Sequence, residues 1–333
     1  MTMTEREQKL YGTNAQIISH SDECTVYRIL DESGEAVMTS YHVLPGIELV
    51  YNDVHMQSCR VDVSPPENIL EINHCREGRI ECSVKNEYIY LTEGDLSIHV
   101  KDDTCRSSYF PLSHYHGISV TVDLEQPLGC LSCMLDGVSV SAVELARRFC
   151  AASGCTVIRA KQCFEHLFSE LYHVPEEIRS GYMKVKVLEL LLFLSALHPQ
   201  EQLPPKAFVI KKSQVDKIKC IKRYLSGNLD SRITVKELSA KFDISQTALK
   251  TCFKGVFGMS IYSFERELKM QKAALLLRKT DDSVMDIAGL LGYDNASKFA
   301  KAFKDVMGAS PKDFRKVCDQ TEPDIAQMER KEL

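Results

Sequence analysis

Polar side chains that can hydrogen bond to DNA bases gather in two short segments near the C-terminal end of the 333-residue chain. Asparagine and glutamine can pair bidentately with adenine, and lysine can reach guanine or a phosphate. The first segment offers Gln246, Thr247, Lys250, Thr251 and Lys254, and the second offers Asn295, Ser297, Lys298, Lys301 and Lys304. These residue types predict a contact with nucleic acid if both segments fold as exposed helices.

Charge is distributed unevenly along the chain, whose formal net charge is −5. Residues 1–205 hold 16 Lys and Arg against 29 Asp and Glu. Residues 206–317 hold 23 against 12, a net charge of +11, and residues 318–333 hold 2 against 5. Each Lys or Arg placed on a phosphate releases a condensed counterion, so the basic block suits a polyanion partner. On charge alone, a basic domain without such a partner remains the alternative.

The two polar segments belong to an internal repeat that predicts paired helices. Residues 234–258, TVKELSAKFDISQTALKTCFKGVFG, align with residues 283–308, SVMDIAGLLGYDNASKFAKAFKDVMG. Each unit has a short capped helix, a turn, and a second helix with Phe-Lys near its end and a closing glycine. Such units place their second helix in a DNA major groove. A connecting helix over residues 260–279 would be on the order of 30 Å long, close to the ~34 Å between successive major grooves.

A helical wheel separates a core face from a DNA face in each second helix. The predicted core faces hold Leu249, Cys252, Phe253, Phe299, Ala302, Phe303 and Val306. The lysines, amides and hydroxyls described above lie on the outward faces. A lone basic helix is usually a solvated surface, but two in register inside a basic block favour DNA binding.

With these motifs, residues 214–317 resemble the AraC/XylS family of bacterial transcription regulators. The matching residues are Leu238, Ile244, Ser245, Leu249, Phe253, Lys254, Gly258, Ala273, Leu276, Leu277, Ile287, Ala288, Gly292, Tyr293, Ser297, Phe299, Phe303, Lys304, Gly308, Ser310, Pro311, Phe314 and Arg315. The resemblance implies an all-α domain of seven helices with two helix-turn-helix motifs. By position, it carries the groove-facing role to Gln246, Thr247, Lys250, Thr251, Ala296, Ser297, Lys298 and Lys301.

Three positions depart from the family pattern. The family often has arginine where Thr251 and Lys301 stand, so a bidentate contact with guanine is weaker or absent there. Asp243 replaces a frequent turn glycine, and aspartate tolerates the left-handed backbone better than most residues. These departures leave the expected mode of binding unchanged and the operator sequence open.

The N-terminal half predicts a sandwich or small barrel followed by helices. Residues 36–135 carry short β-branched and aromatic segments separated by turn signals. Residues 139–198 read as helices, of which Val187–Leu197 is apolar around most of its circumference, so a helix of the same chain or a second subunit must cover it. This layout resembles the cupin-like sensor and dimerising helices of many family members. An effector would bind inside the barrel, where the candidate residues are His74, Arg76, Arg79, Tyr90 and His99.

Two alternative hypotheses would make the protein an enzyme rather than a regulator. Cupin oxygenases bind iron through a His-x-His, Glu and His set, but His114-Tyr115-His116 has no Glu and His at barrel spacing after it. DNA-repair proteins that carry the same kind of DNA-binding domain use a zinc site of four nearby cysteines. Here Cys130 and Cys133 form the one C-x-x-C pair, and Asn73-His74-Cys75-Arg76 has the wrong order for an acceptor motif. We therefore predict no metal, no cofactor and no catalytic residue.

These features predict an α+β protein in five parts: a β-rich cupin-like sensor over residues 1–138, a helical dimerisation segment over 139–198, a linker over 199–213, the double helix-turn-helix domain over 214–317, and an acidic tail over 318–333. The predicted function is that of a cytoplasmic, homodimeric transcription regulator, by family habit an activator. Its expected partners are promoter DNA, a small effector and RNA polymerase. The 13 cysteines, odd in number, indicate reduced thiols. Residues 1–10 lack a signal-peptide layout, and the 11-residue apolar run is shorter than the ~20 residues that span a membrane.

Overall fold

A computed structural model of the chain divides into two compact units, Met1–Lys212 and Ser213–Leu333. The structure describes residues 2–84, 86–102, 107–126, 140–151, 154–197, 209–231 and 233–317. The pair Cys130 and Cys133, most of the predicted linker and the predicted acidic tail lie outside these ranges.

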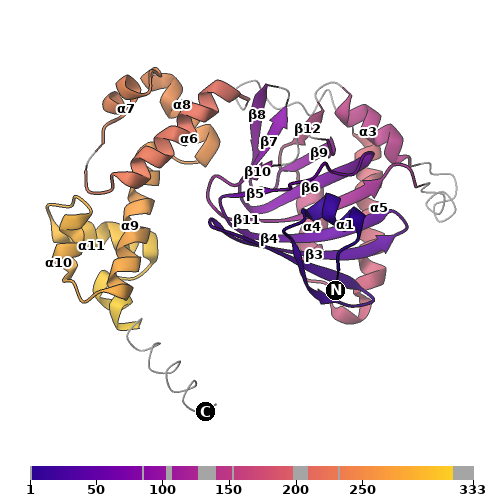
Figure 1. Ribbon diagram of the computed structural model, residues 1–333, viewed down its shortest axis with the longest axis horizontal. Helices are drawn as coiled ribbons and strands as arrows, with labels where there is room; N and C mark the ends of the chain where they lie inside the picture. The colour runs from indigo at the N-terminus through magenta and orange to yellow at the C-terminus, as the bar shows by residue number, and fades with distance from the viewer. Residues whose placement is uncertain are drawn as a thin grey trace, which may run out of the picture. The chain divides into compact units, whose positions relative to one another are not determined.

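An antiparallel sheet of eight strands forms the centre of the N-terminal unit, in the order β1-β2-β3-β4-β11-β6-β9-β12 (Figure 1). Smaller sheets pair β10 with β5 and arrange β13-β8-β7. The strands are β1 (Gln16–His20), β2 (Cys24–Asp31), β3 (Gly34–Leu44), β4 (Ile47–His55), β5 (Ser58–Arg60), β6 (Ile69–Gly78), β7 (Ile80–Val84), β8 (Glu87–Leu91), β9 (Leu96–Val100), β10 (Ser107–Tyr109), β11 (Tyr115–Asp123), β12 (Cys155–Ile158) and β13 (Ile210–Lys211).

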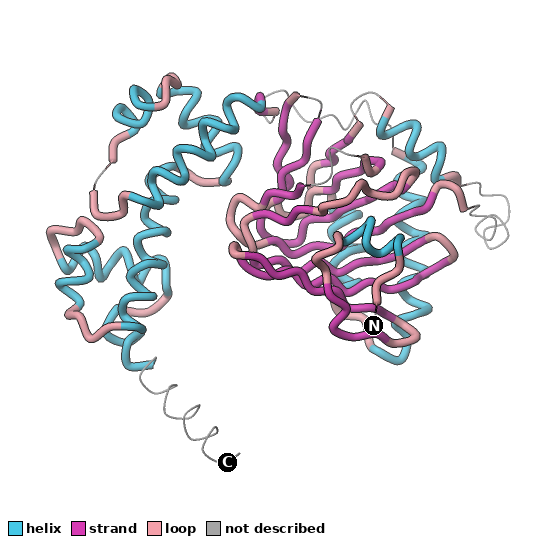
Figure 2. Tube along the Cα trace, in the orientation of Figure 1, coloured by secondary structure: helices cyan, strands magenta, loops and turns pink. Residues whose placement is uncertain are grey.

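Helices cover one face of the large sheet (Figure 2). They are α3 (Ala142–Cys150), α4 (Gln162–Leu171) and α5 (Arg179–Ala196), with a short 3-10 helix at Glu176–Ile178. Their apolar sides share a core with alternate strand residues such as Leu49, Ile72 and Ile118, because successive side chains of a strand point to opposite faces. The opposite sheet face contacts α1 (Glu5–Tyr11), whose last residue stacks on Tyr27 with 4.1 Å between ring centroids.

The segment 139–198, predicted to be helical, also contains a strand. Its four residues Cys155–Ile158 are all buried, and β12 pairs antiparallel with β9. The strand follows Gly154, whose φ of +76° lies in the left-handed region that glycine adopts without a Cβ clash. Short, β-branched runs of this kind are hard to distinguish from buried helix without knowledge of the neighbouring strand.

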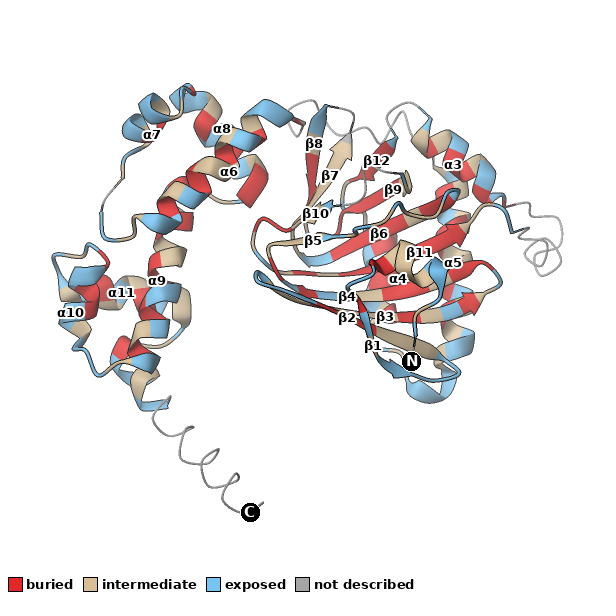
Figure 3. Ribbon diagram, in the orientation of Figure 1, coloured by how far each residue is buried: buried red, intermediate tan, exposed pale blue. Residues whose placement is uncertain are grey.

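The apolar segment predicted at Val187–Leu197 forms the C-terminal part of α5, which ends at Ala196, and is covered largely by its own chain. Val187, Leu190, Leu191 and Leu194 are buried in the core that α5 shares with the sheet. Phe193, by contrast, remains 39% exposed. Figure 3 shows the buried residues concentrated on the central strands and on the inner sides of the helices.

The C-terminal unit is helical throughout its described elements. These are α6 (Lys212–Gly227), α7 (Val235–Lys241), α8 (Gln246–Phe257), α9 (Ile261–Lys279), α10 (Val284–Leu290) and α11 (Ala296–Met307), and residues 311–317 are also helical. Thr234 forms a capping box with Glu237, and Ser245, Ser260, Ser283 and Asn295 cap later helices. Within the described ranges of the whole chain, no helix combines the length and apolar composition needed to cross a bilayer.

Candidate DNA-binding interface

The helix α8 is held by a turn and a cap that its own sequence encodes. Asp243 adopts φ +48°, so the prediction that this residue tolerates the left-handed turn is confirmed. Ser245 Oγ accepts a hydrogen bond from the Ala248 amide nitrogen at 3.2 Å, which satisfies one of the free donors at the helix start. Gly258 ends the helix with φ +78°. The buried face carries Leu249, Cys252 and Phe253, as the wheel predicts.

The helix α11 repeats this construction. Asn295 Oδ1 accepts hydrogen bonds from the amide nitrogens of Ser297 at 2.9 Å and Lys298 at 3.1 Å. Gly308 ends the helix with the same φ of +78° as its counterpart after α8. Phe299 and Phe303 are fully buried, and Ala302 and Val306 pack against their core, which confirms the predicted inward face.

The turn before α11 is anchored from α9. Gly292 has φ +73°, and a Cβ at this position would lie 2.5 Å from the Asp230 carbonyl oxygen, so only glycine fits. Lys269 Nζ lies 3.0 Å from Glu265 Oε1 and donates to the Ser231 carbonyl oxygen at 3.2 Å. Its ammonium is also 6.0 Å from the centroid of the Tyr293 ring. The buried Lys269 therefore joins α9 both to the chain just before the first motif and to the turn of the second motif.

The residues predicted to contact DNA lie on the outer sides of the two motifs. Gln246, Thr247, Lys250, Thr251, Lys254, Asn295, Ser297, Lys298, Lys301 and Lys304 are exposed, and Ala296 is half-buried. Among the described residues, none of the five lysines in this set forms an ion pair, so their charges stay available to an outside anion. The structure gives Asn295 a structural role that the base-contact prediction did not include, because its side-chain oxygen caps α11.

Comparison with known proteins identifies this arrangement. Residues 238–317 match the family described as helix-turn-helix domain. The chain is 30% identical over 127 residues to the HTH-type transcriptional regulator MtrA of Neisseria gonorrhoeae. The matched segment covers 38% of this chain and 42% of that protein. The chain is also 29% identical over 105 residues to the arabinose operon regulatory protein of Escherichia coli K12, which covers 31% and 36%. Residues 238–317 form an AraC-type DNA-binding domain.

A third similarity extends beyond the AraC-type domain. The Msm operon regulatory protein of Streptococcus mutans serotype c is 22% identical over 250 residues, which covers 74% of this chain and 83% of that protein. The chain spans less than half the length of the other two relatives. All three are named as regulators, which favours a regulator over the two enzyme hypotheses.

The five candidate effector residues of the N-terminal unit do not converge on one place. The His74 ring is buried and stacks on Phe168 with 4.0 Å between centroids, on the helix-covered side of the sheet. Arg76 lies nearby, with its guanidinium 4.1 Å from the centre of the Tyr172 ring. Tyr90 donates to Glu81 Oε2 at 2.5 Å, and Arg79 lies 6.0 Å from the Tyr90 ring. His99 is on the opposite sheet face.

That opposite face carries a group of polar side chains, which we call the polar belt: Asn52, Glu71, Asn73, His99, Lys101, Tyr115 and Ser119. Asn73 Oδ1 accepts hydrogen bonds from the Tyr115 hydroxyl at 2.7 Å and from Ser119 Oγ at 3.1 Å. Glu71 lies 3.1 Å from His99 Nε2 and 3.0 Å from Lys101 Nζ. Burial alone would raise the pKa of the Glu71 carboxyl, but Lys101 and His99 outweigh burial and hold that pKa well below its usual range.

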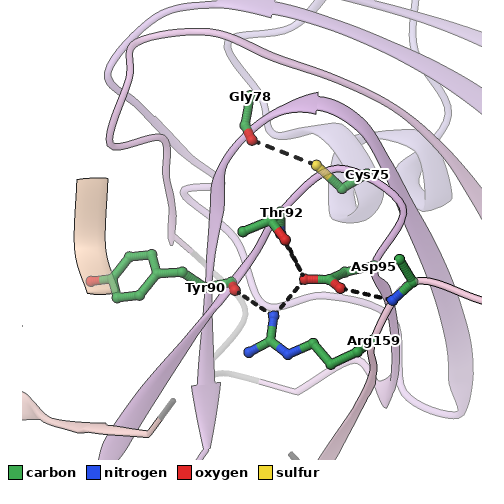
Figure 4. A network of polar contacts seen from close by, with 7 residues as sticks. Cys75, Gly78, Tyr90, Thr92, Asp95 and Arg159 are labelled. Carbon is green, nitrogen blue, oxygen red and sulfur yellow. Dashed lines mark hydrogen bonds and ion pairs between the residues drawn. The ribbon is translucent and has the colours of Figure 1, made fainter. Parts of the chain in front are cut away.

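A turn in the segment LTEGDLSIHV organises the sheet edge next to the belt (Figure 4). Asp95 is buried, and its carboxylate accepts from the Thr92 amide at 2.8 Å, the Thr92 hydroxyl at 2.9 Å and the Ala160 amide at 3.1 Å. Arg159 Nη1 donates to the same carboxylate and to the Tyr90 carbonyl oxygen. This network joins the β8–β9 turn to the residues after β12, so Asp95 and Arg159 have a structural role.

Proposed function

We propose that the protein is a transcription regulator in which the AraC-type domain binds promoter DNA through α8 and α11. The observation that carries the proposal is the repeated construction of these two helices. Each is 12 residues long, starts at a polar cap, ends at a left-handed glycine and buries two phenylalanines while its lysines face outward. The 19-residue α9 joins the motifs; a helix of that length rises about 28 Å, near the spacing of adjacent major grooves.

Within this interface, two kinds of contact are proposed. Gln246, Thr247, Lys250 and Thr251, with Ala296, Ser297, Lys298 and Lys301, lie along the first turns of the two helices, where base edges are read. Lys254 and Lys304 stand later in the helices, immediately after a buried phenylalanine, and suit phosphate contacts. Asn295 keeps its amide nitrogen for DNA, since its oxygen is engaged in the cap.

The N-terminal unit is proposed to be a cupin-like sensor for a small effector. Its polar belt presents amide, hydroxyl, carboxylate and imidazole groups on one sheet face, a mixture suited to a small polar molecule. His99 is the member of the belt that the sequence also predicts. His74, Arg76, Arg79 and Tyr90 lie elsewhere, so we propose His99 as the effector contact among the five.

A homodimer is proposed to form through α5. Val185 and Phe193 on this helix, and Ile178 immediately before it, leave apolar side chains exposed, although the inner side of α5 is covered by its own chain. A second copy of the same stripe could bury them in a two-fold interface.

Activation through RNA polymerase is the remaining proposal. The exposed side chains of Met285 and Leu290 on α10 border a hollow of about 550 Å³ that Asp230, Asp282 and Asp286 also line. An apolar pair within an acidic rim suits a basic protein surface rather than DNA, because phosphates and these carboxylates would repel each other.

DNA binding is tested with the full chain and the DNA upstream of its own coding sequence. We expect a retarded complex in gel electrophoresis that survives an excess of random DNA, and its loss when Lys250 and Lys301 are both changed to Glu. Lys272→Glu is the matched control, because Lys272 is exposed on α9 outside the two recognition helices. Equal binding of upstream and random DNA by the wild type would reject the proposal. Run-off transcription with and without the protein then separates activation from repression.

A further inference from the structure

Three possible metal ligands from two neighbouring strands meet at one end of the large sheet. Asp53 and His55 belong to β4, and His116 belongs to β11. His55 Nε2 lies 2.9 Å from Asp53 Oδ1, and His116 Nε2 lies 3.7 Å from the same oxygen. The ligand atoms of all three residues lie within 4.8 Å of one another, and the imidazole centroids are 5.0 Å apart.

Strand register explains why the three side chains converge. His116 is the direct partner of Asp53 across the β4–β11 pair. Asp53 and His55 are two residues apart, so they point to the same face of β4. Further along these strands the same face carries Tyr51 and Ile118, which pack into the core beneath the helices. Asp53 and His55 are exposed, and His116 is half-buried, so an ion from solvent can reach them.

We propose that Asp53, His55 and His116 bind one divalent transition-metal ion, with Zn²⁺ as the best match. Two imidazoles and one carboxylate are the donors that zinc uses in sites with an open fourth position, at metal–ligand distances of about 2.0–2.2 Å. A tetrahedron with such bonds has edges of about 3.4 Å. The two separations from Asp53 Oδ1, 2.9 and 3.7 Å, lie on either side of that value. The two imidazole donors lie within 4.8 Å of each other, so side-chain rotation must bring them closer together by up to about 1.4 Å.

The donor set also selects against other ions and other histidines. Ca²⁺ and Mg²⁺ require several oxygen ligands, and this site offers one carboxylate. His114 precedes the strand; its ring centroid is 6.4 Å from that of His116, and its Nδ1 lies 3.3 Å from the Leu112 carbonyl oxygen. The His-x-His pair is thus divided, and His116 takes its neighbours from β4 instead. A bound ion would link β4 to β11 by a bridge additional to their main-chain hydrogen bonds.

The test is a calorimetric titration of the full-length protein with Zn²⁺, which uses no DNA and is independent of the proposed regulator function. The wild type should bind one equivalent that His55→Ala and His116→Ala each lose, or bind more than tenfold more weakly. Asp53→Asn should weaken the same equivalent. His42→Ala is the matched control, because His42 is an exposed histidine of the adjacent strand β3 outside the cluster, and it should keep the full stoichiometry.

A spectroscopic readout separates this site from zinc held by cysteine thiols, since the described residues include nine cysteines that are not joined in disulfides. Co²⁺ at the proposed site should give visible d–d bands without a thiolate charge-transfer band, and those bands should be absent in His116→Ala. Mg²⁺ should leave both the calorimetric and the optical signals unchanged. Circular dichroism establishes that each variant is folded. Identical zinc stoichiometry and affinity in the wild type and in folded His55→Ala and His116→Ala would overturn the proposal.

Discussion

Glu265 and Lys269 form an ion pair of 3.0 Å one turn apart on α9, and both residues are buried. Lys269 also donates to the Ser231 carbonyl oxygen and faces the Tyr293 ring. The pair therefore lies where the connecting helix meets the turn before α11. Loss of this ion pair should therefore affect both the stability of the domain and the position of α11.

Replacing Lys269 should destabilise the C-terminal unit more than an exposed change on the same helix. Lys269→Ala leaves the Glu265 carboxylate buried without its partner, which costs about 3–5 kcal/mol. Lys272→Ala, at an exposed position of α9, should change the free energy of unfolding by less than about 0.5 kcal/mol. Urea unfolding monitored by circular dichroism measures both. The double variant Glu265→Gln/Lys269→Met should recover part of the loss; no recovery would contradict the ion-pair explanation.

Asn295 should contribute to the stability of α11 whether or not it contacts DNA. Asn295→Ala removes the acceptor for the Ser297 and Lys298 amides and should cost about 1 kcal/mol of stability, whereas Asn295→Ser retains a cap and should cost less. Thermal unfolding of both variants gives the cap contribution. If DNA affinity falls equally in both, the Asn295 amide contacts DNA; if affinity follows the stability, the residue acts only through the cap.

Lys301 and Lys304 should respond differently to the same substitution. Lys301→Ala should weaken binding to the preferred operator by about 1–3 kcal/mol and leave binding to random DNA less affected, if Lys301 contacts a base. Lys304→Ala should weaken both and reduce the slope of log K against log salt by about one unit, as expected for a phosphate contact. Fluorescence anisotropy over a salt series measures these quantities. An unchanged slope in Lys304→Ala would remove it from the backbone contacts.

His74 should make the N-terminal unit less stable as the pH falls. Burial lowers the pKa of its imidazole to about 4, and within the described residues neither ring nitrogen has a hydrogen-bond partner. The unfolded ring has a pKa of about 6.5, so below that pH the unfolded state binds the proton first. Above about pH 6.5 the ring is neutral in both states, and the free energy of unfolding has its full value. As the pH approaches 4, the free energy of unfolding falls by roughly 3 kcal/mol.

His74→Phe removes this titration and keeps an aromatic ring against Phe168. Urea unfolding of the wild type and the variant between pH 4 and 7 provides the comparison, because every other side chain is the same in both proteins. The difference in unfolding free energy between the two should change with pH in the stated direction. A constant difference would show that His74 titrates alike in the folded and unfolded states.

The outer side of α5 should decide the oligomeric state. Val185 is 59% exposed, and Val185→Glu introduces a charge into the proposed apolar interface, where two copies would repel. We expect a dimer for the wild type and a monomer for the variant in light scattering at micromolar concentration. Leu30→Glu is the control, since Leu30 is a similarly exposed apolar residue on β2. A monomeric wild type would reject a role for α5 in dimerisation.

Features that depend on neighbouring residues in the chain could be read from the sequence. The internal repeat is visible in the sequence itself. Local interactions, within a few residues, produce the serine caps, the buried faces with Phe253 and Phe303, and the left-handed turn at Asp243. Helical periodicity places these side chains without knowledge of the rest of the fold. The AraC-type domain was for this reason recognisable from its residues.

Features that join distant segments depended on the tertiary structure. The sequence grouped His114 with His116, but sheet register places His116 beside Asp53 and His55, about 60 residues earlier in the chain. The same register puts His74 and His99 on opposite faces of the sheet. It also pairs β12 with β9, although the sequence predicts a helix in that segment. Strand alternation is local, whereas the choice of partner strand is not. The chain alone therefore determined which residues lie on the outer faces of α8 and α11, and only the fold decided which polar side chains of the N-terminal unit meet.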